Sequence, residues 1–267
     1  MEKIILQLAF LLIIANCGIS ECSTLPVISV YSGRWTWRAK IEYENDFIRC
    51  IFRDSKISPF LSRVSLTDKK APTLIENCGP SIQKFEKVSI EYKGEAFTIL
   101  CENPVPETAI VPFWKTKGIL VFPGNKPQFS MMEEIKVLKK GKISLSSFNF
   151  DLHGASPIAV YTKKEDRIEK TELVEHKEYK FQIGFDFMVI VTKNGFVCIR
   201  VDPGIKKDTG VAGDLLIQRK EKTTIASLFW RLDEAVEGEE ILLGLIFYLY
   251  PSSEKMEDIF REMETKI

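Results

Sequence analysis

The stretch that decides the fold is FDFMVIVTKNGFVCIRV, residues 185–201. The phenylalanine and valine residues of its first half fall at every second position, so on a β-strand they share one face. The dipeptide Asn194-Gly195 favours a tight hairpin turn. The returning segment, Phe196–Val201, is apolar on much of both faces, as expected of a strand deep in a packed sandwich. These residues predict a hairpin inside a β-sandwich.

Two more hairpins are predicted nearer the N-terminus, each with strand-like arms and turn residues between them. The stretch between the two hairpins, from Asp54 to Pro80, is mixed and irregular. It is expected to need anchoring, which Cys50 and Cys78 are placed to provide. The paired segments are 37–44 with 47–52, and 88–92 with 96–101.

Strand patterns also fill the chain beyond residue 110. Pro104 and Pro106 interrupt the pattern before it, and we take them as a domain boundary because proline cannot donate to a strand ladder. The apolar set changes phase at Ser146-Ser147, which indicates a β-bulge. The expected strands are 134–140, 143–152, 158–161, 185–191, 196–201, 215–217, 225–232 and 241–250.

The period changes near the C-terminus. Met256, Ile259, Phe260, Met263 and Ile267 recur at the spacing of one helix face. This helix either docks on its own sheet or binds a partner or a membrane surface, and its mixed-sign polar face favours docking. The expected fold class is mostly β, with two small β domains and a short C-terminal helix. The predicted parts are a signal peptide at 1–20, a disulfide-stabilised β domain at 21–104, a β-sandwich domain at 105–250 and an amphipathic helix at 251–267.

Residues 1–20 have the layout of a secretory signal peptide. A short charged start precedes the apolar run Ile4–Ala15, which is too short to cross a membrane as a helix. Gly18 and Ser20 supply the small side chains expected before a cleavage site after Ser20. We therefore expect a secreted, extracellular protein with no membrane span.

The cysteines agree with this location. Removal of residues 1–20 takes one of the 6 cysteines, and most of the others lie in the first third of the mature chain. Disulfides persist in an oxidising compartment, so two are expected there, with the pairing left open. Cys198 is expected to be a buried thiol outside them. The disulfide candidates are Cys22, Cys50, Cys78 and Cys101.

The segment from Ile143 to Gln218 resembles a galectin-type carbohydrate-recognition domain. Four stretches carry the resemblance: an alternating strand, a Phe-to-Gly turn into an apolar strand, an Asn-Gly turn with its following strand, and a late strand containing the pair Gly213-Asp214. The resemblance implies a galectin-like β-sandwich that binds sugar. The four stretches are 143–152, 181–185, 194–199 and 208–217.

The sugar-binding positions of that family are altered here. Galectins share a strand reading His-x-Asn-Pro-Arg, and Tyr161, Lys163 and Glu165 fall at its three functional positions without matching. No tryptophan follows between Arg167 and Phe181, although acidic residues do. β-Galactoside binding of the usual kind is not expected, because a sugar ring needs an aromatic plane and fixed polar partners. The ligand-binding candidates implied by the resemblance are Tyr161, Lys163, Glu165, Glu172 and Glu175.

Catalytic motifs are missing from the sequence. It contains no nucleophile elbow, phosphate loop or dinucleotide fingerprint. The two histidines, His153 and His176, favour turn or loop roles. Glu133 and Glu134 point to opposite faces of a strand, which favours solvated charges over a catalytic pair. We therefore expect no catalytic residue, metal or cofactor, and a non-enzymatic protein.

Two functions stay open on the sequence. The first is a secreted binding module whose galectin-like domain contacts a glycan or an extracellular protein. The second is a structural or protein-interaction protein with no small ligand. A hydrolase whose site is invisible in the sequence is a weaker third. Nucleic acid is not an expected partner, because 37 basic and 37 acidic residues cancel.

Overall fold

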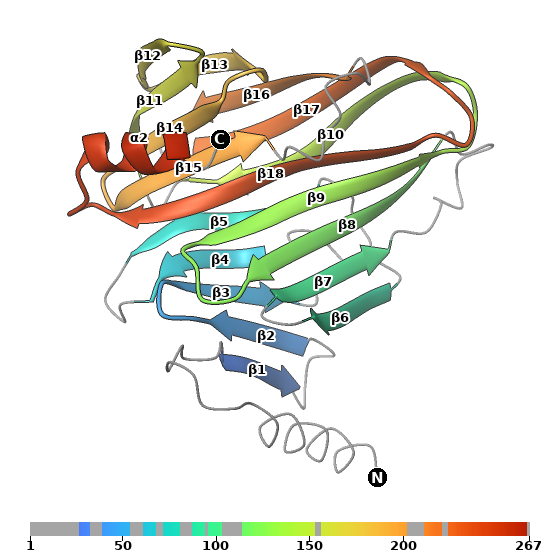
Figure 1. Cartoon of the computed structure of the whole chain (residues 1–267), viewed down its shortest axis with the longest axis horizontal. Helices are drawn as coiled ribbons and strands as arrows, with labels where there is room; N and C mark the ends of the chain where they lie inside the picture. Colours follow the sequence, from blue (N-terminus) through green and yellow to red (C-terminus); the bar gives the residue numbers. More distant parts are fainter. Residues whose placement is uncertain are drawn as a thin grey trace.

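The structure is a computed structural model that describes residues 27–32, 39–53, 61–67, 72–80, 87–93, 96–102, 114–152, 156–201, 211–220 and 224–265. Within these ranges the chain forms two antiparallel sheets of nine strands each. One helix, α2 (Met256–Thr265), follows the last strand. The predicted mostly β fold class and the C-terminal helix are confirmed. Figure 1 shows the two sheets as stacked layers, with α2 beside the last strand.

Sheet A draws its strands from both ends of the chain. In spatial order it contains β1 (Val27–Ser32), β2 (Ala39–Glu44), β3 (Ile48–Arg53), β4 (Leu61–Leu66), β5 (Thr73–Pro80), β10 (Gly141–Asp151), β17 (Thr224–Ala235), β16 (Val211–Arg219) and β13 (Lys177–Gln182).

Sheet B is built in the same way. In spatial order it contains β12 (Arg167–Glu172), β11 (Pro157–Lys164), β14 (Phe187–Thr192), β15 (Gly195–Val201), β18 (Glu240–Pro251), β9 (Gln128–Val137), β8 (Trp114–Pro123), β7 (Ala96–Glu102) and β6 (Lys87–Lys93). The predicted boundary near residue 104 therefore falls between β7 and β8, two strands that hydrogen-bond to each other.

The local predictions largely hold. The hairpins β2–β3, β6–β7 and β14–β15 form where the alternation placed them. The predicted bulge is present, because the register between β10 and β17 shifts between Ser146 and Phe148. The stretch 54–80 departs from the expectation. It contains β4 and β5, which pair with each other, and β5 pairs with β10 across the sheet. This pairing supplies order that the local sequence does not signal.

The central hairpin is apolar on both faces because both faces are covered. The inward residues of β14 and β15, such as Ile190 and Ile199, join the main core between the sheets. Their outward residues, such as Val189 and Cys198, join a second core under α2. The C-terminal helix is thus a third layer of the molecule.

Within the described ranges, no helix is long and apolar enough to span a membrane.

A row of aromatic rings runs through the main core. Tyr43 of β2 meets Phe122 of β8 at 4.6 Å between ring centroids, and Phe122 stacks on Phe129 of β9 at 5.9 Å. Phe129 stacks on Phe247 of β18 at 4.8 Å. Phe247 then meets the edge of Phe150, on β10, at 5.5 Å. The row begins and ends in sheet A and passes through sheet B.

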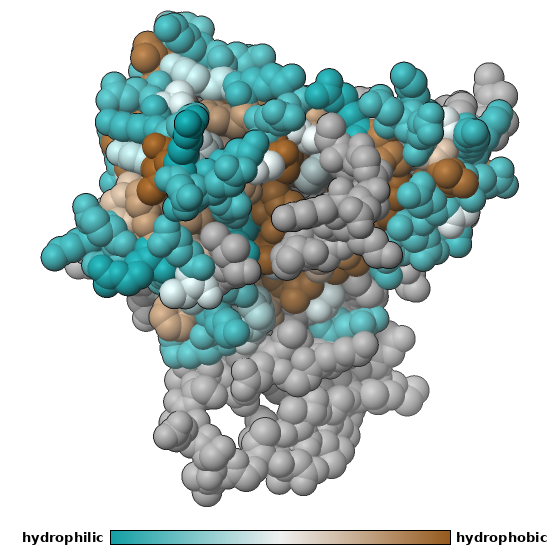
Figure 2. Space-filling model, turned by 45° about the horizontal axis from the view of Figure 1, so that its top comes forward, coloured by the Kyte–Doolittle hydropathy of each residue, from teal (hydrophilic) through white to brown (hydrophobic). Residues whose placement is uncertain are grey.

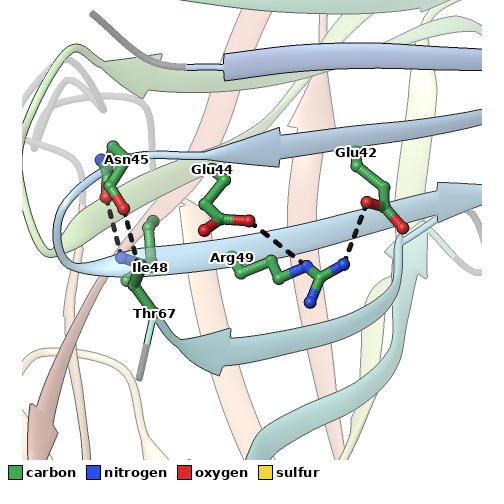
Figure 3. A network of polar contacts seen from close by, with 6 residues as sticks. All are labelled: Glu42, Glu44, Asn45, Ile48, Arg49 and Thr67. Carbon is green, nitrogen blue, oxygen red and sulfur yellow. Dashed lines mark hydrogen bonds and ion pairs between the residues drawn. The ribbon is translucent and has the colours of Figure 1, made fainter. Parts of the chain in front are cut away.

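Asn45 ties the two sheets together at one end. It lies in the β2–β3 turn, where its Oδ1 accepts hydrogen bonds from the backbone N–H groups of Phe47 and Ile48. Figure 3 shows the bond from Ile48. Its Nδ2 donates to the carbonyls of Gly124 and Lys126, in the β8–β9 turn of sheet B, at 2.9 and 3.0 Å. Thr67 donates to the Asn45 carbonyl. The Asn45 N–H donates to the Ile48 carbonyl at 3.1 Å, so every polar group of this 5 % exposed residue is used.

Replacing Asn45 by alanine should cost about 2–4 kcal/mol of unfolding free energy, because several buried backbone groups lose their partner at once. Chemical denaturation measures the loss. The matched control is Asp46→Ala at the next residue of the same turn; its carboxylate accepts a hydrogen bond from Asn125, but this contact is exposed, so its loss should cost less than about 1 kcal/mol. Equal losses in the two variants would contradict the structural role given to Asn45.

Candidate functional site

Two of the five sequence-derived ligand candidates lie under the C-terminal helix. Tyr161 and Lys163 are on β11 and point to the outer side of sheet B. Tyr161 meets the edge of Phe260 at 5.8 Å between centroids, and the Lys163 Nζ lies 3.1 Å from Glu264. Both side chains therefore help to dock α2. The expectation that this helix packs on its own sheet is confirmed.

The other three candidates are spread along the neighbouring loops. Glu165, in the β11–β12 turn, donates its backbone N–H to Asp186. Glu172 ends β12 and pairs with Lys170 at 2.9 Å, a hydrogen bond that lowers the pKa of its carboxyl. Glu175 lies beyond it and is paired with an arginine of β16. The structure does not gather these residues into one open site.

The candidate cysteines are not shown to form disulfides. Cys50 and Cys78 are buried free thiols, and burial raises the pKa of each. A direct bond between them is excluded by topology, because β4 lies between β3 and β5. The Cα atoms of residues on strands that are two positions apart in a sheet are separated by about 9.6 Å, which is longer than a disulfide can span. The Cys101 side chain and Cys22 lie outside the description. Cys198 is buried and not disulfide-bonded, as expected.

The outer face of sheet A carries a different arrangement, centred on Asp214 of β16. Its Oδ2 lies 3.0 Å from the Nζ of Lys180, on β13, and 2.9 Å from an Nη atom of Arg231, on β17. The Asp214 side chain is 9 % exposed, whereas those of Lys180 and Arg231 are more than half exposed. A desolvated carboxylate is thus fixed between two cations that still reach the solvent.

An aromatic ring and an amide complete this group. In the sheet register Asp214 lies directly opposite Phe229 on β17 and opposite Gln182 on β13, so the three side chains share a face. Phe229 points away from the core because its neighbours, Leu228 and Trp230, point into it. We call this group the Asp214 cluster; it contains Lys180, Gln182, Asp214, Phe229 and Arg231.

The backbone under the cluster is held by close packing. A Cβ on Gly213 would lie 2.6 Å from the ring of Trp230, so glycine is the residue that lets the indole pack against this strand. The Gly213 carbonyl also accepts a hydrogen bond from the Ile183 N–H at 2.8 Å, which extends the pairing of β13 and β16. Asp214 therefore projects from a strand that is fixed on both sides.

The sequence-based view of the polar residues needs two changes. Glu133 is 1 % exposed and is not the solvated charge that was expected, because its side of β9 faces sheet A between Met131 and Ile135. In the sequence, Asp214 stands out only within the Gly213-Asp214 pair of the late strand that resembles galectins. Alternation in β16 could have flagged its outward face, but its partners on β13 are set by long-range pairing. His176 is exposed in a loop, as expected, and His153 lies outside the described residues.

The described residues offer no obvious metal site, since no group of three or more histidine, cysteine, aspartate or glutamate side chains among them is placed to hold an ion. Figure 2 shows one face of the molecule, where polar residues cover most of the outer part of the coloured surface and apolar residues appear near its middle. The Asp214 cluster combines an aromatic ring with charged donors and acceptors on an outer face, and unlike Tyr161 and Lys163 its side chains are not engaged in docking α2.

Solved structures share this fold. A galactose mutarotase-like protein from Lactobacillus casei superposes with a TM-score of 0.53 over 79% of this chain and 100% of its own, at 9% identity. A galactose mutarotase related enzyme from Lactobacillus acidophilus gives 0.50 over 81% and 99%, also at 9% identity. A TPR-domain containing protein from Parabacteroides distasonis gives 0.52 at 7% identity; the match covers 87% of this chain and only about half, 54%, of that protein. No protein-family model and no curated protein sequence matches the chain.

These comparisons correct two predictions. The galectin resemblance is wrong: the architecture is that of the galactose mutarotase-like proteins, and the four stretches that suggested galectin are strand and turn patterns that many sandwiches share. The expectation of a non-enzymatic protein is also contradicted, because one protein of this architecture is named as an enzyme. A sequence pattern that predicts stacked strands therefore does not exclude enzymatic activity.

Replacing Ile259 by aspartate should undock α2, because a carboxylate would have to be buried against the sheet. Alkylation of Cys198, which lies under the helix, should then become at least about tenfold faster, while Cys50 and Cys78 in the main core stay protected. Peptide mass spectrometry after alkylation measures each thiol separately. Arg261→Ala is the control, since Arg261 is exposed on the same helix. An unchanged alkylation rate of Cys198, or equal labelling of all three cysteines, would contradict a separate third layer formed by α2.

Proposed function

We propose that the chain is an exported carbohydrate-recognising protein that holds a sugar ring on the Asp214 cluster. Recognition is the step that sugar-binding proteins and sugar-converting enzymes share. The fold supports a sugar as ligand by analogy, since two proteins of this architecture are named for galactose mutarotase. The site itself carries the main argument.

The decisive observation is the composition of the cluster. The apolar C–H face of a sugar packs against an aromatic ring, and its hydroxyls need fixed donors and acceptors. Phe229 supplies an outward aromatic ring beside Asp214. Asp214 supplies an ordered acceptor, and Lys180 and Arg231 supply donors. The side chains come from three neighbouring strands, so the sheet fixes their spacing.

Replacing Asp214 by asparagine should weaken saccharide binding by about tenfold or more, because hydrogen bonds to charged groups are worth roughly 1.5–3 kcal/mol. Phe229→Ala should have a similar effect through loss of the stacking surface. Isothermal titration of the purified protein with a panel of saccharides measures both.

The control for Asp214→Asn is Glu172→Gln, the same chemical change at an exposed position on sheet B. It should leave the affinity unchanged. An intact affinity in Asp214→Asn together with a loss in Glu172→Gln would place the ligand on the other sheet and overturn the assignment.

Export is the second part of the proposal, and it rests on the apolar N-terminal run Ile4–Ala15. In a secreting eukaryotic cell the full chain should appear in the medium with Glu21 as its first residue, which N-terminal sequencing detects. Replacing Leu11 and Leu12 by lysine should keep it inside the cell, because a charged run is not recognised as a signal. A cytosolic chain that keeps residues 1–20 would contradict the proposal. Buried thiols with raised pKa values are compatible with export, since such thiols react slowly.

A further inference from the structure

The Asp214 cluster has unused hydrogen-bonding capacity. Lys180 and Arg231 both contact the same oxygen, Oδ2 of Asp214. Within the part of the chain that the structure describes, neither cation has another partner, and Oδ1 of Asp214 accepts no hydrogen bond. An ammonium has three donors and a guanidinium has five, so most of these donors stay available. A ligand therefore meets one open acceptor between two donor groups.

The unused donors at this site are cationic. The cluster contains two cations and one carboxylate. Two acids lie further along the same strands and point to other partners: Glu178, two residues from Lys180, keeps its charge and accepts a hydrogen bond from the neutral Gln218, and Asp233, two residues from Arg231, lies 4.0 Å from Lys142. A neutral sugar would use the acceptor and leave most of the cationic donors of Lys180 and Arg231 to water, whereas an anionic group would engage them.

We propose that the natural ligand is an acidic saccharide, whose ring carries a carboxylate or a sulfate. This inference rests on the proposed function, because it names the sugar class for the same site. The anionic group bridges Lys180 and Arg231, where the planar guanidinium can present two parallel N–H donors. A ring hydroxyl donates to Oδ1 of Asp214. The apolar face of the ring lies on Phe229.

The experiment compares matched sugars on the purified protein by isothermal titration at low salt: methyl glucoside as the neutral reference, methyl glucuronide for the carboxylate and glucose 6-sulfate for the sulfate. At least one acidic sugar should bind about tenfold more tightly than the neutral one, since two half-exposed ion pairs each contribute a modest factor. Raising the salt concentration should reduce this preference. Comparing the affinities of the glucuronide and the sulfate shows whether the site prefers a carboxylate or a sulfate.

Variants test the same idea on the protein. Lys180→Gln with Arg231→Gln should abolish the preference for acidic sugars, while Glu172→Gln should keep it. Circular dichroism and thermal unfolding check that each variant is folded. If the double variant is not folded, Lys180→Gln alone, at a half-exposed position, takes its place in the comparison.

Binding of all three sugars with equal affinity would overturn the acidic ligand but leave the sugar site in place. No binding of any of them, or of the wider saccharide panel, would overturn the site as well.

Discussion

The row of five aromatic rings between the sheets is the constraint on which the rest of the structure depends. It starts at Tyr43 and ends at Phe150, both in sheet A, and passes through three phenylalanines of sheet B. All five side chains are buried. Truncating one such ring typically costs about 3–5 kcal/mol, so the row outweighs any single surface interaction. Because the rings come from β2, β8, β9, β18 and β10, they fix how strands distant in sequence stack across the two sheets.

This stacking decides which surfaces are left for function. Each sheet has one face in the main core. On sheet B, α2 covers the part of the second face formed by β14, β15 and β18. Ile259 and Met263 are buried there, and this is why the central hairpin is apolar on both sides. Sheet A keeps polar side chains on its second face, among them Lys180 and Arg231. The surface chemistry thus differs between the two sheets, and the proposed ligand site lies on the polar face rather than on the face under the helix.

The sequence was informative where structure is local. Alternation and turn residues predicted the β14–β15 hairpin, the bulge after Ser146 and the helix from Met256. It failed where long-range pairing decides. The strands β4 and β5 carry weak local signals and gain their order from the sheet. The Asp214 cluster could not be assembled from sequence, because β13 meets β16 only through the fold. The galectin resemblance failed because it rested on strand and turn patterns that do not encode strand order.

We propose that the outer face of sheet A, and not the face under α2, receives the ligand. Chemical-shift mapping of the backbone amides during titration with a uronic acid tests this most directly. The account predicts that the perturbed amides cluster on β13, β16 and β17, around Lys180, Asp214 and Phe229. Shifts concentrated on β11 and α2, around Tyr161 and Lys163, would contradict it.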